Sequence, residues 1–303
     1  MVLNNLFEKG NITIVVTDSG LGGLSVAADV AERLKDSGIF RSSRIIFFNS
    51  SFDNKSGYNV ITDHQEKIRI FNNALESMVD RYQPDLILIA CNTLSVIYPE
   101  TPFHAETRIP VVGIVKTGVD LILEKRKNSP DADIILFGTQ TTISGGTHKN
   151  ALIAAGVPAE SLYGIACGNL ADLIEEGASS AETRTRIFAK VAEALAIRTQ
   201  RLRPMIAALV CTHYGYAADI FEQELIKQGA QVTAIINPNP QMADFLFATQ
   251  DMHRYPHTTV TVEVICKVSI FPEIMESITR LIGPLSPETS RAIRDYTRDV
   301  NLF

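Results

Sequence analysis

Residues 12–34, ITIVVTDSGLGGLSVAADVAERL, hold three features in immediate succession: an apolar β-branched run, a polar glycine-rich turn and an amphipathic helical repeat. A run that is apolar on both faces and leads through a turn into a helix is typical of a central parallel strand covered by helices. Strands alternating with helices along the chain predict an α/β protein with parallel sheets. Further strands are expected at residues 44–48, 86–90, 111–115, 134–137, 206–210 and 234–236, and further helices at 66–79 and 218–228.

Similar motifs recur 120 residues apart. Cys91 and Cys211 each follow an apolar run. The turn at Asp18 has its counterpart at Gly138. A duplicated α/β unit explains this spacing, and it predicts two similar domains related by a pseudo-twofold axis. Because ligands of open α/β sheets bind beyond the carboxyl ends of the strands, the active site is expected in the cleft between the domains, with one cysteine on either wall.

The C-terminal part of the chain has a different pattern. Residues 259–269 alternate apolar and polar side chains, which is typical of a strand with one buried face. A helix is expected at 272–282, ended by Gly283. The last stretch, 286–303, is charged and is expected to form a surface helix or a frayed tail.

The composition excludes several classes of protein. The 303 residues are 46% hydrophobic and carry a net charge of −6, without a basic run that would bind nucleic acid or an anionic membrane. No apolar stretch approaches the roughly 18 residues of a membrane span, and no signal peptide is recognisable. The four cysteines form no CxxC pair and no disulfide framework. A cytoplasmic protein with free thiols is therefore expected.

Three short motifs combine side chains that can carry chemistry: Asp18-Ser19-Gly20-Leu21-Gly22-Gly23, Cys91-Asn92-Thr93 and Cys211-Thr212-His213. Each stands where a strand ends and a helix begins, and the free N–H groups of a helix N-terminus favour a carboxylate or a thiolate. Two cysteines in matching places, each beside a polar residue, favour a functional pair over two inert buried thiols.

Other interpretations of these residues are weaker. Asp18 with Ser19 could simply cap a helix. The glycine-rich motif has neither the GxGxxG pattern nor the lysine of a phosphate-binding loop. A zinc site would lack the usual ligand spacing, because two of its three ligands would fall within one CTH tripeptide, so no metal is expected. Cys167 and Cys266 lack polar neighbours of this kind, so both are interpreted as core thiols.

The sequence resembles the cofactor-independent aspartate/glutamate racemase superfamily, and within it the glutamate racemases most closely. The resemblance runs from about residue 12 to residue 283. It rests on six motifs in order: DSGLGGLSV at 18–26, LILIACNT at 86–93, PVVGIV at 110–115, FGTQTT at 137–142, DLIEEG at 172–177 and VCTHY at 210–214.

The resemblance implies racemisation of an amino acid, L- to D-glutamate or a related acidic one, by two bases on opposite faces of Cα. Cys91 and Cys211 are the implied pair, since a thiol can serve as base when ionised and as acid when protonated. Asp18 and His213 are expected to assist proton transfer, with Glu175 orienting His213. The polar side chains expected to hold the substrate are Ser19, Asn92, Thr93, Thr142 and Thr212.

The resemblance also implies how the chain is organised and what it works with. One domain is expected from residues 1–107 together with 231–303, and the other from 108–230. Neither pyridoxal phosphate nor another cofactor is implied. The expected partner is a small-molecule amino acid, with neither nucleic acid nor membrane, and a homodimer is possible. D-glutamate made by such an enzyme would feed cell-wall peptidoglycan synthesis.

Several departures from the family fall on the substrate side. Residues 49–58, NSSFDNKSGY, lack the usual Pro-Tyr-Gly, although Gly57 or Tyr58 could substitute for it. Other departures are Lys116-Thr117 in place of Glu-Pro, SGGTHK at 144–149, and Tyr214-Gly215 in place of Tyr-Pro. Three alternatives therefore stay open: a racemase or isomerase of aspartate or another dicarboxylate, a non-catalytic amino-acid-binding regulator, and another kind of α/β enzyme.

Overall fold

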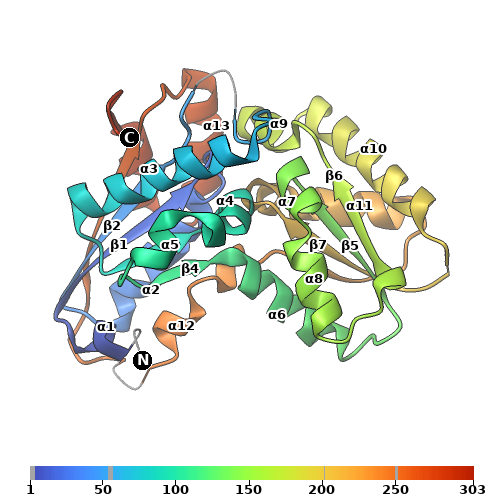
Figure 1. Cartoon of the computed structure of the whole chain (residues 1–303), viewed down its shortest axis with the longest axis horizontal. Coiled ribbons are helices and arrows are strands. Elements are labelled where there is room, and N and C mark those ends of the chain that lie inside the picture. The colour runs from blue at the N-terminus through green and yellow to red at the C-terminus, as the bar shows by residue number, and fades with distance from the viewer. Residues whose placement is uncertain (1–3, 54–56, 201, 250–251) are drawn as a thin grey trace. The chain divides into compact units, whose positions relative to one another are not determined.

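The structure is a computed structural model that describes residues 4–53, 57–200, 202–249 and 252–303. The chain forms two compact domains (Figure 1). The first contains the described residues up to Gly113 and those from Asn239 onward, and the second contains Ile114 to Pro238. Within the described residues, no helix is both long and apolar enough to span a membrane.

The first domain is built on a parallel sheet with the strand order β10-β9-β2-β1-β3-β4. Its strands are β1 (Asn11–Asp18), β2 (Ser42–Asn49), β3 (Leu86–Ile89), β4 (Val111–Gly113), β9 (Thr259–Cys266) and β10 (Thr297–Arg298). The central strand β1 runs VVTD into the glycine-rich turn, and Val15 and Val16 are wholly buried. The carboxyl end of β1 therefore lies between the carboxyl ends of β2 and β3.

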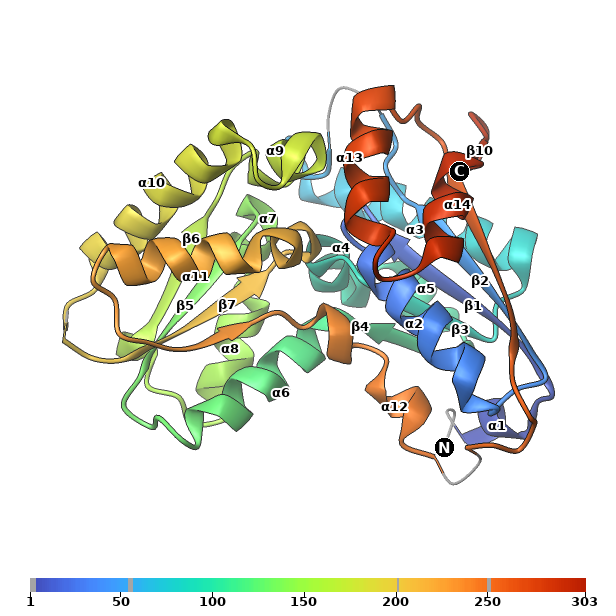
Figure 2. The ribbon, with the colours of Figure 1, turned by 180° about the vertical axis from the view of Figure 1, so that it is seen from behind.

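Helices cover both faces of this sheet (Figures 1 and 2). One face carries α2 (Leu24–Ser37), α13 (Pro272–Ile282) and α14 (Pro287–Arg294). The other carries α3 (His64–Tyr82), α4 (Asn92–Ile97) and α5 (Pro102–Glu106). The short helices α1 (Asn4–Glu8) and α12 (Asp244–Phe247) complete the domain. Buried side chains of α3, Phe71 and Leu75 among them, pack with Val15 and Ile46 of the sheet in one apolar cluster.

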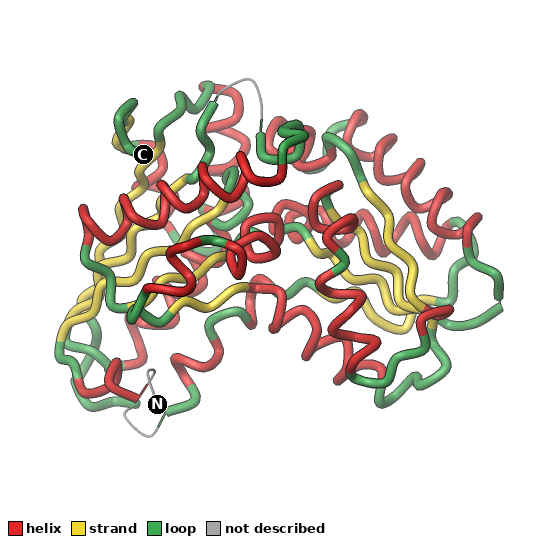
Figure 3. Tube along the Cα trace, viewed as in Figure 1, coloured by secondary structure: helices red, strands yellow, loops and turns green. Residues whose placement is uncertain are grey.

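The second domain repeats this plan on a smaller scale (Figure 3). Its parallel sheet has the order β6-β5-β7-β8, formed by β5 (Asp133–Gly138), β6 (Leu162–Ala166), β7 (Met205–Val210) and β8 (Val232–Ile236). On one face lie α6 (Ile114–Arg126), α7 (Gln140–Gly145) and α8 (Thr147–Ala154). The opposite side carries α9 (Leu170–Gly177), α10 (Ala181–Ile197) and α11 (Ala218–Lys227).

The duplication expected from the spacing is confirmed by the strand order. Four neighbouring strands of the first sheet have the order β2-β1-β3-β4. The second sheet has the order β6-β5-β7-β8, so in both domains the first strand along the chain lies between the second and the third. The 120-residue spacing also holds for β6, which starts at Leu162 as β2 starts at Ser42. This strand was not among those expected, because Tyr163 and Gly164 interrupt its apolar run and it lies at the edge of its sheet.

Besides β6, the structure differs from the sequence expectations in the domain boundaries, in the end of β4 and at the C-terminus. The domains change after Gly113 and before Asn239, rather than at 107 and 231, because β4 pairs with β3 and β8 pairs with β7. The strand expected at 111–115 ends at Gly113, since α6 begins at the next residue.

The third difference lies at the C-terminus: the stretch 286–303 contains the expected helix, α14, but the residues after it are not a frayed tail. After α14, the short strand β10 pairs with β9, and the side chain of Leu302 is buried in the same apolar cluster as Val15. The carbonyl of Leu302 accepts a hydrogen bond from Ser77 of α3. The end of the chain is thus part of the first domain's core.

Candidate active site

In the first domain, Asp18 and Cys91 stand at the carboxyl ends of neighbouring strands. Asp18 is the last residue of β1, and Cys91 follows β3 after a single residue. The two strands stay paired to the end, because the N–H of Ala90 donates to the carbonyl of Thr17 at 2.9 Å. Both side chains are almost fully buried, with 1% of Asp18 and 5% of Cys91 exposed. The structure therefore brings together two residues that are 73 positions apart.

Cys91 is the N-cap residue of α4, and its sulfur is surrounded by hydrogen-bonding groups. The N–H of Leu94 donates to Sγ at 3.5 Å, and the hydroxyl of Ser19 lies 3.2 Å from it. Burial and the nearby charge of Asp18 raise the pKa of the Cys91 thiol, while the Ser19 and Leu94 hydrogen bonds lower it. Because burial dominates, Cys91 rests as a neutral thiol with donors already placed for its thiolate.

The glycine-rich turn lets helix α2 begin directly against Asp18. A Cβ on Gly23 would lie 2.8 Å from the Cβ and 2.9 Å from Oδ2 of Asp18, closer than real side chains approach. It would also lie 3.0 Å from Ala90 on the neighbouring strand. The carboxylate of Asp18 itself accepts a hydrogen bond from the N–H of Gly20 at 3.2 Å. The DSGLGG motif thus positions a carboxylate by close packing.

Asn92 and Thr93 open α4 beside Cys91, and each is 2% exposed. Neither the amide nitrogen nor the amide oxygen of Asn92 has a hydrogen-bond partner among the described residues. Buried polar groups in native proteins are normally paired, and an unpaired one costs about 1–3 kcal/mol. A ligand that offers one acceptor and one donor would satisfy the side chain of Asn92.

In the second domain, Cys211 directly follows β7 and is followed by His213. The sulfur of Cys211 lies 3.8 Å from Nδ1 of His213. On the other side of the ring, Nε2 of His213 lies 2.6 Å from Oε1 of Glu175, which α9 supplies. Burial alone lowers the pKa of His213, but the hydrogen bonds to Cys211 and Glu175 raise it well above its usual value. These hydrogen bonds favour the protonated form of His213, which can donate toward Cys211.

Threonine hydroxyls surround the carboxyl ends of the strands in this domain. Thr139 caps α7 by accepting a hydrogen bond from the N–H of Thr142 at 3.3 Å, and the two hydroxyls lie 3.0 Å apart. Thr142 is 2% exposed and Thr212 is 1% exposed. Thr139 was not among the candidates, although it belongs to the FGTQTT motif and would have been found by its N-cap position.

The remaining cysteines are both fully buried. Cys167 donates weakly to the carbonyl of Ile165 at 3.6 Å, and burial raises its pKa to about 12. Cys266 ends β9 within the first domain. Both environments are those of inert packing thiols.

Tyr58, which could substitute for part of the family's Pro-Tyr-Gly, is a buried polar residue of the 49–58 loop. Its side chain is 1% exposed, and its hydroxyl has no hydrogen-bond partner in the described part of the chain. The ring contacts that of Phe52 edge-on, with centroids 5.4 Å apart. Burial, and the charge that Cys91 can carry, raise the pKa of Tyr58 well above its usual value. Residues 54–56 of the same loop lie outside the described residues.

Comparison with known proteins identifies the family of this chain. Residues 21–201 match the family described as Asp/Glu/Hydantoin racemase. The chain belongs to this racemase family. A glutamate racemase from Chlorobaculum tepidum is 31% identical over 209 residues, which is 69% of this chain and 70% of that protein.

Solved structures of the racemase family share the fold. The glutamate racemase isoform RacE1 from Bacillus anthracis has a TM-score of 0.69 at 20% identity, covering 91% of this chain and 95% of its own. The glutamate racemase from Francisella tularensis, solved in complex with D-glutamate, has a TM-score of 0.67 at 21% identity and covers 90% and 94%. The racemase architecture thus extends over both domains of this chain.

Proposed function

We propose that this protein is a cofactor-independent glutamate racemase in which Cys91 and Cys211 exchange the proton at Cα. The observation that carries the proposal is the paired design of the two domains. Each domain presents a buried cysteine at the carboxyl end of a central strand, beside an ionisable side chain of its own: Asp18 in the first and His213 in the second. Membership of the racemase family and the 31% identical glutamate racemase support the reaction and its substrate.

The chemistry needs two groups because the proton leaves one face of Cα and another proton arrives on the opposite face. In one direction a thiolate takes the Cα proton and becomes a thiol, and the electron pair of the broken C–H bond stays on the substrate. The second cysteine, as a thiol, then donates its proton to the opposite face and becomes the thiolate. The reverse reaction exchanges the two roles, and no atom or electron is gained or lost overall.

The neighbouring ionisable groups would carry protons to and from the thiols. Asp18 would accept the proton that must leave Cys91 before the neutral thiol can act as a base. His213, held cationic by Glu175, would donate toward Cys211. The carboxylate of Glu175 would therefore act through His213 as a positioning residue.

The substrate would be held by neutral polar side chains around the strand ends. The unpaired amide of Asn92 supports this assignment, because it lacks the partners that a bound carboxylate and ammonium would supply. The full set proposed to contact the substrate is Ser19, Asn92, Thr93, Thr142 and Thr212. Short hydroxyl and amide donors at helix N-termini suit carboxylates without adding a charge that would compete with the thiols.

The test is exchange of the Cα proton with solvent deuterium, followed by NMR for a panel of free amino acids. We expect exchange and racemisation of glutamate by the wild-type chain. Cys91→Ala and Cys211→Ala should each abolish racemisation. Cys266→Ala is the matched control, because it removes a buried thiol that has no proposed role. Normal turnover by either active-site variant would overturn the proposal.

The substrate panel also tests a second candidate, a racemase of aspartate or another dicarboxylate. This second candidate is supported by residues 49–58, which depart from the family pattern and contain the buried Tyr58. Faster exchange with aspartate than with glutamate would assign that substrate. We further propose that the enzyme works in the reducing cytoplasm, which keeps its thiols free, and that it forms a homodimer, which light scattering would measure.

A further inference from the structure

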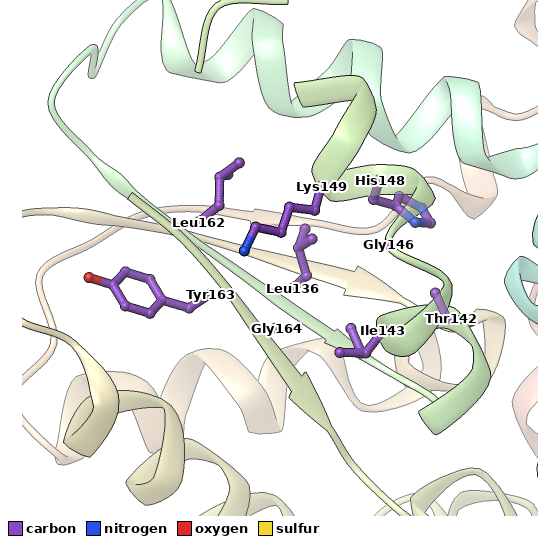
Figure 4. A pocket seen from close by; sticks show the side chains of 9 residues that line it. All are labelled: Leu136, Thr142, Ile143, Gly146, His148, Lys149, Leu162, Tyr163 and Gly164. Atoms are coloured by element: carbon purple, nitrogen blue, oxygen red, sulfur yellow. The ribbon is translucent and has the colours of Figure 1, made fainter. Parts of the chain in front are cut away.

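The second domain contains a cavity that neither of the proposed catalytic cysteines lines (Figure 4). Its volume is about 240 Å³, and it lies between helices α7 and α8 and the strands β5 and β6. Pockets for drug-sized ligands are roughly 300–1,000 Å³, so this one suits a smaller molecule of about one ring. Of the residues proposed for the reaction, Thr142 lines it.

The floor of the cavity is apolar. Leu136 of β5 and Leu162 of β6 face it from the sheet, and Ile143 of α7 closes one side. Gly164 allows this arrangement, since a Cβ there would lie 2.8 Å from the Cγ2 atom of Ile143. These surfaces favour a flat or compact apolar body.

His148 lines the cavity from α8 and is 2% exposed. Neither of its ring nitrogens has a hydrogen-bond partner among the described residues. Burial lowers the pKa of His148 to about 4, so the ring is neutral and offers one donor and one acceptor. A group that both donates and accepts, such as a hydroxyl, would satisfy it.

Lys149 supplies the cavity with a positive charge. In Figure 4 its side chain extends over the strands, with the amino group towards Leu162, whereas the ring of His148 lies towards Gly146. The amino group makes no ion pair with any residue that the structure describes. A lysine that points over an apolar floor favours an anionic group on the ligand.

We propose that this cavity is a binding site for a small amphipathic carboxylate that carries a hydroxyl at its far end. Its carboxylate pairs with Lys149, its apolar body rests on Leu136 and Leu162, and its hydroxyl bonds to His148. Neither proposed catalytic cysteine lines this cavity, and of the proposed substrate contacts Thr142 alone is in its lining. The proposal therefore stands whether or not the chain racemises glutamate.

The probe that matches this arrangement is 4-hydroxybenzoate, measured by titration calorimetry on the full chain. Benzoate lacks the hydroxyl, and 4-hydroxybenzamide lacks the charge. We expect 4-hydroxybenzamide, which loses the charge-assisted bond to Lys149, to bind about tenfold more weakly than 4-hydroxybenzoate. Benzoate, which loses only a neutral hydrogen bond to His148, should bind about two- to tenfold more weakly.

Variants test the individual contacts. Lys149→Met should weaken 4-hydroxybenzoate about tenfold without changing the affinity for 4-hydroxybenzamide. Lys127→Met is the matched control, because Lys127 is exposed and lies away from the cavity. His148→Phe should remove the preference for 4-hydroxybenzoate over benzoate. Leu162→Phe should fill the cavity and abolish binding of all three probes.

A variant without the two proposed catalytic thiols separates this site from the thiol chemistry. Cys91→Ala/Cys211→Ala should bind 4-hydroxybenzoate as tightly as the wild type, because neither cysteine lines the cavity. Weaker binding by that variant, equal affinity in Lys149→Met and wild type, or no binding to the wild type at millimolar concentration would each overturn the proposal. Lys149→Met still tests the proposal if Leu162→Phe fails to fold, because Lys149 is exposed and its substitution should not disturb folding.

Discussion

Nε2 of His213 lies 2.6 Å from Oε1 of Glu175, and both side chains are largely buried, with 7% and 16% exposed. The contact joins the motif after β7 to helix α9, which are 38 residues apart. It holds the imidazole ring with its second nitrogen toward Cys211. The same contact thus couples the stability of the second domain to the protonation of a proposed catalytic group.

Cys211 and Glu175 together raise the pKa of His213, and Glu175→Gln should remove the contribution of the carboxylate. The folded-state pKa lies above the usual 6.5, so the stabilisation is fully present below that pH and is lost as the pH rises through the folded-state pKa. We expect the variant to lose about 1.5–3 kcal/mol of unfolding free energy near pH 6. The difference in unfolding free energy between the variant and the wild type should become smaller at higher pH, as measured by urea titration.

The matched control for this pair is Glu100→Gln. Glu100 also contacts a histidine, His64, at 3.0 Å, but both side chains are 50% exposed. An exposed pair contributes about 0.2–1 kcal/mol, so this variant should change stability little at any pH. Equal losses in the two variants would contradict the special role of the buried pair.

Asp18→Asn should make the Cys91 thiol react faster with an alkylating reagent and at the same time slow racemisation. The charge of Asp18 raises the pKa of the Cys91 thiol, so its removal should lower that pKa. Iodoacetamide should then label Cys91 roughly three- to tenfold faster near pH 8, as read by peptide mass spectrometry. Racemisation should fall by about two to four orders of magnitude, because the proton acceptor is lost. Asp85→Asn, at the opposite end of β3, should change neither rate.

Much of the fold could be predicted from the sequence, because buried parallel strands need apolar side chains on both faces. The run at 12–17 became β1, and the helix expected at 272–282 has these bounds in the structure. Strand β10 could not be predicted, since a two-residue strand has no period. The burial of Leu302 likewise depends on contacts with residues far away in the chain.

The site could be predicted only in part. The strand-to-helix position of Cys91 is a local feature, and local sequence showed it. The buried and unpaired states of Tyr58 and His148 are not local, because they depend on which elements pack over each side chain. No pattern of neighbouring residues could distinguish them from exposed polar groups.

Gly23→Ala should displace Asp18 without removing it. The new Cβ would lie within 3.0 Å of Asp18 and Ala90, so the strand end or the start of α2 must shift. We expect roughly 1–3 kcal/mol of destabilisation from overpacking, together with a racemisation rate lowered about ten- to a hundredfold. Gly118→Ala in α6 is the control, since its Cβ would meet only ordinary contacts of 3.8 Å or more. Full activity of Gly23→Ala would contradict the close-packing account of the motif.

Arg198→Met should destabilise the second domain strongly. Nε of Arg198 lies 2.8 Å from Oδ2 of Asp133 at the start of β5, and both side chains are 1% exposed. Removing the cation leaves a buried carboxylate that the more distant Arg203, at 3.7 Å, cannot fully compensate. We expect a loss of about 3–5 kcal/mol in urea unfolding, whereas Glu276→Gln in an exposed pair should lose less than about 1 kcal/mol. The double variant Asp133→Leu/Arg198→Met should recover much of the loss, because no unpaired charge then remains buried. A double variant less stable than Arg198→Met alone would contradict this explanation, because the loss of stability would then not come from an unpaired buried carboxylate.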